Sequence, residues 1–215
     1  MKHVNIIPLL IAAFAFLAIH TFANDRYTEA MQKNIEVVYT AKSVEEIQAA
    51  VNAFERIGDA EKSKWEPFYY ASYGYLMIAL RVNEPAAKDK QLDLALETLK
   101  KASAVNSAES EIVALEGFIH MIRVTIDPAS RGQQYSGLAM QTFGKAIGMN
   151  PENPRALALM AQMQYGTAQF FGSPTTEACG TLNKALEKFE TYKSTNPLAP
   201  VWGKSMAEGM KAQCK

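Results

Sequence analysis

A repeat of about 45 residues is the feature that most constrains how this chain can fold. Alanines recur at intervals of 45, 44 and 46 residues, at Ala50, Ala95, Ala139 and Ala185. Four positions after each alanine stands a large apolar residue: Phe54, Leu99, Phe143 and Phe189. Self-similarity at such a period is typical of stacked supersecondary units that bury their apolar faces against one another. We therefore expect a solenoid.

The pattern within each repeat is helical. Apolar residues at intervals of three and four share one face of a helix, and no stretch alternates in the manner of a strand. Ser43 and Glu46 form a capping box, and Pro154 and Pro200 are placed at the first turn of a helix. The expected helices lie near 25–41, 43–57, 65–82, 88–105, 109–126, 133–149, 154–170, 175–194 and 200–213.

The second helix of each repeat resembles the tetratricopeptide repeat family. Ala139, Phe143, Ala146 and Pro151 match the second half of the family motif, although the repeat exceeds the usual 34 residues. The surplus falls in loops near 83–87, 127–132 and 171–174. The chain also looks like exported envelope proteins of Gram-negative bacteria that carry such repeats. The resemblance implies an all-α superhelix of about four extended hairpins with a C-terminal capping helix, and it transfers no catalytic residue.

The N-terminal segment has the pattern of a secretory signal peptide. Lys2 precedes an apolar run over 6–19, and the small-residue end at 21–23 suits signal peptidase. The run has 14 residues, whereas a bilayer-spanning helix needs about 20. We expect a signal peptide at 1–23 and one repeat domain at 24–215, in the periplasm or outside the cell.

Charge and composition exclude several kinds of partner and cofactor. Removal of residues 1–23 takes away Lys2, so 21 basic and 22 acidic residues remain and the net charge is −1. Without a basic patch, binding to nucleic acid or to an anionic membrane surface is not expected. His120 is the only histidine after residue 23, which excludes a two-histidine metal motif. We expect no metal and no cofactor.

The two cysteines are expected to form a disulfide. The midpoint between Cys179 and Cys214 falls at the predicted turn between the last two helices, so antiparallel packing would bring them together. An exported protein meets conditions that permit such a bond. The alternative is two unrelated buried thiols.

The helix expected near 109–126 carries a narrow polar stripe. Glu116, His120 and Arg123 lie along it, while nearly all other side chains are apolar. One interpretation is that these three side chains contact a polar ligand in the concave groove of the solenoid. The other is an ordinary solvated strip.

Further groove candidates lie on the neighbouring first helices. Tyr70 and Arg81 fall outside the broad aromatic face of the helix near 65–82, and Arg155 and Gln162 share a polar strip on the helix from Pro154. Packing against the preceding hairpin is the alternative for Tyr70. Stacked together, these strips would form one groove floor.

Each of two enlarged loops has two possible roles. In the first loop, one interpretation is that Asp127 caps the next turn, with Arg131 as its ion-pair partner and Gly132 at positive φ. The other is that Arg131 binds a carboxylate at the edge of the groove. The loop after Phe170 and Phe171 either exposes or buries these two rings.

The sequence favours a non-catalytic scaffold that binds a protein or peptide of the cell envelope. The first alternative is a small-molecule or glycan-binding protein associated with uptake, which exposed Tyr70 and Tyr73 would favour. The second is an enzyme that uses His120 as general base, oriented by Glu116.

Overall fold

The computed structural model describes residues 25–214, so the predicted signal peptide at 1–23 lies outside the described residues. The described part is all-α, as expected, with nine helices and a terminal 3-10 turn. The first helix covers 25–40. It is followed by α2 (Val44–Ala60), α3 (Glu66–Ala79), α4 (Pro85–Val105), α5 (Ser110–Val124), α6 (Pro128–Met149), α7 (Pro154–Phe171), α8 (Thr176–Thr191), α9 (Lys204–Lys211) and η1 (Ala212–Cys214).

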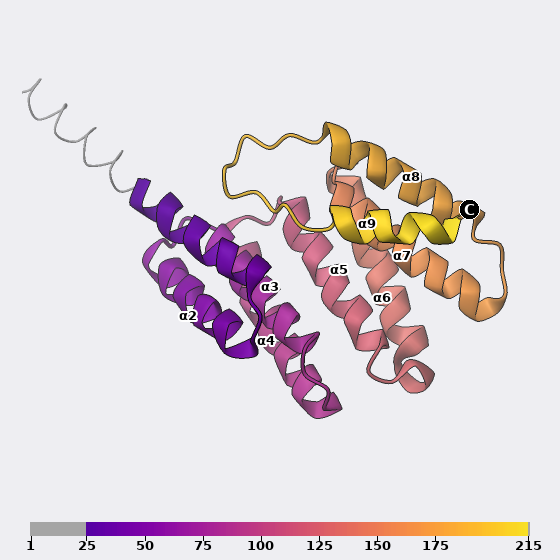
Figure 1. Cartoon of the computed structure of the whole chain (residues 1–215), viewed down its shortest axis with the longest axis horizontal. Helices are drawn as coiled ribbons and strands as arrows, with labels where there is room; N and C mark the ends of the chain where they lie inside the picture. Colours follow the sequence, from indigo (N-terminus) through magenta and orange to yellow (C-terminus); the bar gives the residue numbers. More distant parts are fainter. Residues whose placement is uncertain (1–24, 215) are drawn as a thin grey trace, which may run out of the picture.

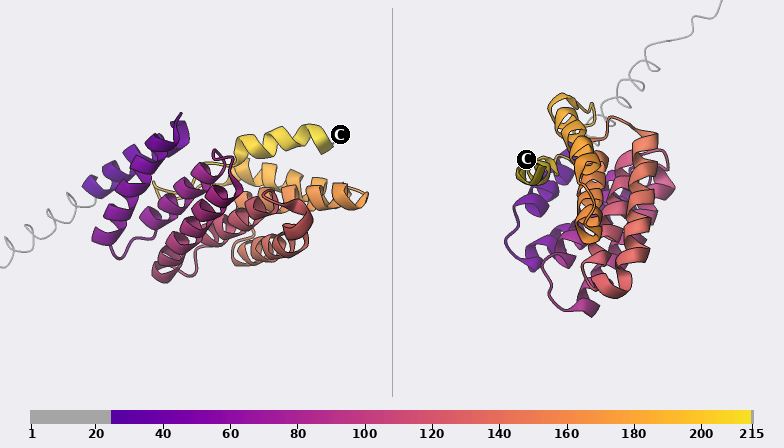
Figure 2. Two further views of the ribbon diagram at one scale, coloured as in Figure 1. Left: turned by 90° about the horizontal axis from the view of Figure 1, so that it is seen from below. Right: turned by 90° about the vertical axis from the view of Figure 1, so that its right-hand side faces the viewer.

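Successive helices pair as hairpins that stack along the long axis of the molecule (Figures 1 and 2). The pairs are the 25–40 helix with α2, α3 with α4, α5 with α6, and α7 with α8, and α9 packs on α8 and α7 as a cap. This arrangement confirms the expected solenoid. None of the described helices is both long and apolar enough to cross a bilayer.

The repeated small residues form the contacts between helices. Ala50, Ala95, Ala139 and Ala185 are all buried. Glycines bring facing helices closer still, since a Cβ atom at Gly117 would overlap the ring of the buried Phe143. The motif that identified the repeat therefore lies in the packing surface of the second helices.

Local signals set several helix starts. Ser43 Oγ accepts from the backbone N–H of Glu46 at 3.2 Å, and Glu46 Oε2 accepts from the N–H of Ser43 at 3.3 Å, so the capping box is confirmed. Asn153 caps α7 by accepting from the N–H groups of Arg155 and Ala156, each at 3.0 Å.

The structure corrects the expectation of a loop at 127–132. Helix α6 begins at Pro128, because Asp127 caps it and proline is favoured in the first turn. Asp127 Oδ1 accepts from the N–H of Ser130 at 3.2 Å, as the capping interpretation predicted. Gly132 has no positive φ, and Arg131 pairs with Asp89 of α4 rather than with Asp127.

The structure also corrects the expected start of the last helix. It starts at Lys204 rather than near Pro200, because the chain reverses at Gly203, whose φ is 102°. The segment over 192–203 is consequently an extended strap between α8 and α9.

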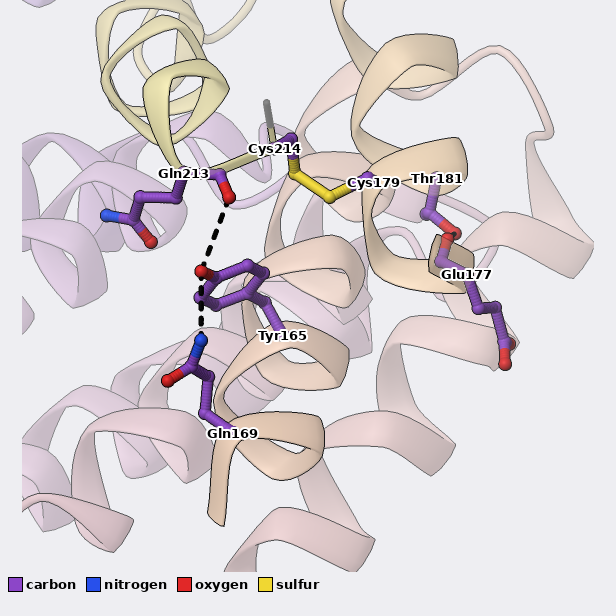
Figure 3. The surroundings of a disulfide bond; sticks show 7 residues. All are labelled: Tyr165, Gln169, Glu177, Cys179, Thr181, Gln213 and Cys214. Atoms are coloured by element: carbon purple, nitrogen blue, oxygen red, sulfur yellow. Dashed lines mark hydrogen bonds between the residues drawn. A yellow bond between two sulfur atoms is a disulfide. The ribbon is translucent and has the colours of Figure 1, made fainter. Parts of the chain in front are cut away.

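The predicted disulfide is confirmed. Cys179 of α8 and Cys214 are joined, with their Cα atoms 5.5 Å apart (Figure 3). Beside the bond, the Tyr165 hydroxyl donates to the carbonyl oxygen of Gln213 at 3.4 Å and accepts from Gln169 at 3.0 Å. These contacts fix the C-terminal segment to the last hairpin.

Candidate functional site

The strap at 192–203 crosses the face formed by the first helices of the hairpins. The Tyr70 hydroxyl of α3 donates to the carbonyl oxygen of Leu198 at 2.8 Å. The backbone N–H of Val201 donates to the Tyr39 hydroxyl at 3.5 Å. The chain's own C-terminal segment therefore lies where a groove ligand was expected.

Trp202 is the main anchor of the strap. Its ring stacks between Tyr73 of α3 and Phe118 of α5, with centroid distances of 5.4 and 5.7 Å. Its indole N–H donates to the Tyr69 hydroxyl at 3.0 Å. One residue thus joins two successive hairpins through the strap.

A buried ion pair lies behind the tryptophan. Arg155 of α7, only 2% exposed, donates to both carboxylate oxygens of Glu111 of α5 at 2.7 Å. Its third nitrogen lies 3.4 Å from the carbonyl oxygen of Trp202. Burial works to lower the pKa of Arg155, but the hydrogen bonds and charge of Glu111 outweigh it and raise that pKa. Arg155 is therefore a permanent cation that holds the strap.

An open cleft remains between the strap and the 25–40 helix. Its volume is about 370 Å³, and its exposed lining is mostly apolar. The walls are formed by Gln32, Ile35, Glu36, Tyr39, Thr40, Tyr70, Pro197, Leu198, Ala199 and Val201. Burial raises the pKa of both Tyr39 and Tyr70, so the two phenols are neutral in the physiological range. The cleft is suited to an apolar ligand with one exposed edge.

Arg81, just after α3, contacts the chain directly after the 25–40 helix. Its guanidinium donates to the carbonyl oxygen of Ala41 at 3.0 Å, and Ala41 follows the lining residue Thr40. The arginine is exposed, so part of its hydrogen-bonding capacity faces solvent.

A second cleft of about 480 Å³ lies between the 25–40 helix and α2. Its lining includes two arginines, Arg26 and Arg56, and the apolar residues Ala30, Ala53 and Ile57. None of the residues named from the sequence as site candidates lines it.

The predicted stripe on α5 has contacts mainly with second helices. Glu116 Oε1 lies 3.9 Å from His120 Nε2, and proximity to His120 lowers the pKa of Glu116. The His120 ring stacks on Tyr135 of α6 at a centroid distance of 6.2 Å. Arg123 is buried and pairs with Asp89 of α4 at 2.9 Å.

Arg123 also pairs with Asp93, so two carboxylates of α4 hold it. The stripe therefore includes one side chain that joins hairpins. No hydroxyl or thiol side chain is hydrogen-bonded to His120 among the described residues, so the enzyme alternative gains no nucleophile from this geometry. Within residues 25–214, no group of three or more His, Cys, Asp and Glu is placed to hold a metal ion.

The other sequence candidates divide into two groups. Tyr70, Arg81 and Arg155 hydrogen-bond to backbone carbonyl groups: Tyr70 and Arg155 to the strap, and Arg81 to Ala41. Gln162 is exposed on α7, away from any side-chain hydrogen bond among the described residues. Tyr70 and Tyr73 are 1% and 7% exposed, which disfavours stacking of a sugar on either ring.

Sequence reasoning missed the residues that the strap brings to the cleft. Leu198 and Val201 of the strap were missed because a helix was expected to begin near Pro200, and Tyr39 of the 25–40 helix was missed because its partner Val201 lies on the strap. The signal that could have found it is Gly203, since glycine directly before a helix favours a left-handed turn.

The chain is similar to solved helical-repeat structures. No protein-family model matches it, and no curated protein matches its sequence. The HusA haemophore from Porphyromonas gingivalis superimposes with a TM-score of 0.78 and 27% identity, over 88% of this chain and 92% of that one. The tetratricopeptide repeat protein TTC0263 from Thermus thermophilus matches with a TM-score of 0.53 and 13% identity, over 92% of this chain and 95% of that one. The present chain is thus a tetratricopeptide-repeat-like solenoid.

Proposed function

We propose that this protein binds haem as cargo, in the cleft between the strap and the 25–40 helix, and takes part in its uptake. The observation that carries the proposal is the likeness to a haemophore at 27% identity over most of both chains. This supports the small-molecule alternative better than the protein-binding interpretation.

The chemistry of the cleft supports the same ligand class. Haem is a flat apolar ring with two carboxylates on one edge, so it needs apolar walls and a nearby cation. Tyr39, Leu198 and Val201 supply apolar and aromatic surface, and the cleft volume of about 370 Å³ falls within the range of small-molecule sites. The ring would lie against these walls with one edge toward solvent.

Arg81 is the residue we assign to the carboxylate edge. Guanidinium groups bind carboxylates through two parallel hydrogen bonds, and Arg81 contacts Ala41, the residue after Thr40 of the cleft lining. Glu36 lines the cleft one turn earlier and would repel a carboxylate placed there. The two charges therefore favour a single orientation of the ligand.

The strap argues against an extended peptide as the main ligand. Trp202 and Leu198 already occupy the face of the first helices on which tetratricopeptide repeats would hold such a peptide. A peptide could enter only if the buried contacts of Trp202 were broken.

Export of the protein belongs to this proposal. A disulfide that closes between Cys179 and Cys214 suits an oxidising compartment, and the segment at 1–23 has the pattern of a signal peptide. A carrier for haem uptake would work in the periplasm or outside the cell.

Titration of residues 24–215 with haemin, followed by Soret absorbance, tests the proposal. Val201→Glu places a carboxylate in the apolar wall and should weaken binding by about tenfold or more. Leu138→Glu makes the same change on exposed α6 and should leave the affinity unchanged. Arg81→Gln should weaken binding by a smaller factor, about three- to tenfold.

Two results would contradict this assignment. Absence of saturable haemin binding would remove the function itself. Equal affinities for the wild-type protein and Val201→Glu would show that haem binds elsewhere.

A further inference from the structure

Helix α7 ends in two adjacent phenylalanines that face solvent. Phe170 and Phe171 are 80% and 71% exposed, and their rings meet edge to face with a centroid distance of 5.0 Å. The helix stops directly afterwards at Gly172, which has a φ of 64°. Burial of large apolar side chains is favourable, so an exposed pair of this size indicates a contact surface.

The aromatic tip, Phe170 with Phe171, stands at an extremity of the molecule. The loop that joins α7 to α8 projects at the end of the solenoid farthest from the 25–40 helix (Figure 1). Nothing else in the described chain covers the two rings, as their exposure shows. A flat surface could therefore reach the tip without contacting the rest of the solenoid first.

The stretch of sequence around the tip contains no charged residue. No charged residue lies between Arg155 and Glu177, although charged residues make up 20% of the chain. The loop after the two rings is built from glycine, serine, proline and threonine. Such a tip can leave bulk water without stripping solvent from an ion, which is costly.

The size of the tip distinguishes a lipid surface from a protein partner. A stable protein interface buries about 800 Å² on each side, with an apolar centre and a polar rim. The other large exposed apolar side chains of the described residues are Leu80, Leu138 and Val201, and none lies on α8 beside the tip. Two projecting rings are too small for such an interface, but aromatic side chains enter the interfacial layer of a bilayer singly.

The geometry points to Phe170 and Phe171 as a shallow anchor that inserts into an uncharged lipid surface. The inference goes beyond haem binding and does not depend on it. With two rings and no basic residue between Arg155 and Glu177, attachment is weak, reversible and insensitive to salt. A phosphatidylcholine bilayer, whose zwitterionic headgroups carry no net charge, is the surface that fits this chemistry.

Sedimentation of residues 24–215 with phosphatidylcholine vesicles tests the anchor. We expect measurable binding that stays unchanged when salt is raised about tenfold. Phe170→Ser/Phe171→Ser should weaken it by about tenfold or more, because both apolar rings are lost. The matched control Leu80→Ser/Leu138→Ser removes two exposed apolar side chains elsewhere and should change binding by less than about twofold.

Circular dichroism and the haemin affinity of each variant report whether it has folded and kept its cleft. The inference is overturned if the wild-type protein does not bind these vesicles, or if the control loses as much binding as the tip variant. Binding only to anionic vesicles, abolished by salt, would also overturn it in favour of charge-driven adsorption. So would self-association in sedimentation velocity that the tip variant abolishes without any vesicle binding, because the rings would then contact a second copy.

Discussion

At the scale of single residues, the buried pair of Arg155 and Glu111 lies directly behind the strap. The pair joins α5 to α7, and Arg155 also reaches the backbone of Trp202. Glu111→Leu leaves the arginine buried without its partner and should lower the free energy of unfolding by about 3–5 kcal/mol. Urea denaturation at neutral pH measures the loss.

The double variant Glu111→Leu/Arg155→Met is the control for this prediction. It leaves no charge behind, so its loss should be smaller than that of the single variant. If the double variant were as unstable as the single one, lost packing rather than the stranded charge would be responsible.

The carboxylate of Asp89 should make the stability of the protein depend on pH. Hydrogen bonds from Arg131 lower the pKa of Asp89 below its ordinary 3.8. Partial burial opposes this shift, and the positive charges of Arg131 and Arg123 add to it. Since the folded pKa is the lower one, the contribution to stability is present above the ordinary value and is lost as pH falls through the folded value. Asp89→Asn should destabilise the protein by about 1 kcal/mol at neutral pH.

Urea titrations from neutral pH down to acid would follow this difference. The gap between wild type and Asp89→Asn should close as the carboxyl becomes protonated. Glu29→Gln, a change on the exposed face of the 25–40 helix, should show no comparable gap at neutral pH. A gap for Asp89→Asn that persisted in acid would contradict the ion-pair explanation.

At the scale of elements, close approach of paired helices depends on glycine. A Cβ atom at Gly117 of α5 would overlap the ring of Phe143 of α6, whereas Gly137 of α6 has open space around its Cα. Gly117→Ala should therefore lower the free energy of unfolding by about 1–3 kcal/mol, despite the better helix propensity of alanine. Gly137→Ala gains only the propensity and should stabilise by up to about 1 kcal/mol.

Thermal denaturation of the two variants provides the measurement. Opposite signs of the shift are expected, because the same chemical change meets a packed ring in one position and solvent in the other. A stabilising Gly117→Ala would mean that α5 and α6 can separate without cost.

At the scale of the whole molecule, the disulfide holds the cap on the solenoid. Cys179 and Cys214 are 35 residues apart, so the bond restricts a long loop of the unfolded chain. Its reduction should cost about 3–4 kcal/mol and lower Tm by about 6–16 °C for a chain of this size. Differential scanning calorimetry with and without reductant measures this shift.

The matched variant Cys179→Ser/Cys214→Ser should already have the lower Tm and should not respond to reductant. A similar response in the variant would show that the reductant acts on something other than this bond. The haemin titration of the same variant would show whether the cap also supports the cleft wall formed by the strap.

Much of the fold followed from local chemistry, because helix signals act over a few residues. The capping box at Ser43, the proline in the first turn of α7 and the buried alanines of the repeat are where the sequence placed them. The predicted start of α6 was wrong. Asp127 followed by Pro128 is a strong helix start, and Gly132 does not form the turn that was expected there. Helix boundaries are the part that such competition decides.

The candidate site depended more on tertiary structure. Tyr70 was named from the sequence, but its neighbours Leu198 and Val201 come from a segment more than a hundred positions later. Arg155 looked like a groove residue and is instead buried against Glu111. Periodicity reports which face of a helix is polar, but it does not report which distant side chain meets that face.

The sequence by itself determined the repeat, the helical hairpins and the pairing of the cysteines, because each depends on spacing along the chain. Only the tertiary structure decided that the strap fills the face of the first helices, that a cleft remains beside the 25–40 helix, and that Phe170 and Phe171 stay in solvent. The physical reason is that burial and long-range contact are properties of the packed chain. The path of an irregular segment such as 192–203 is set by the surfaces that it meets, here the rings of Tyr73 and Phe118 on either side of Trp202.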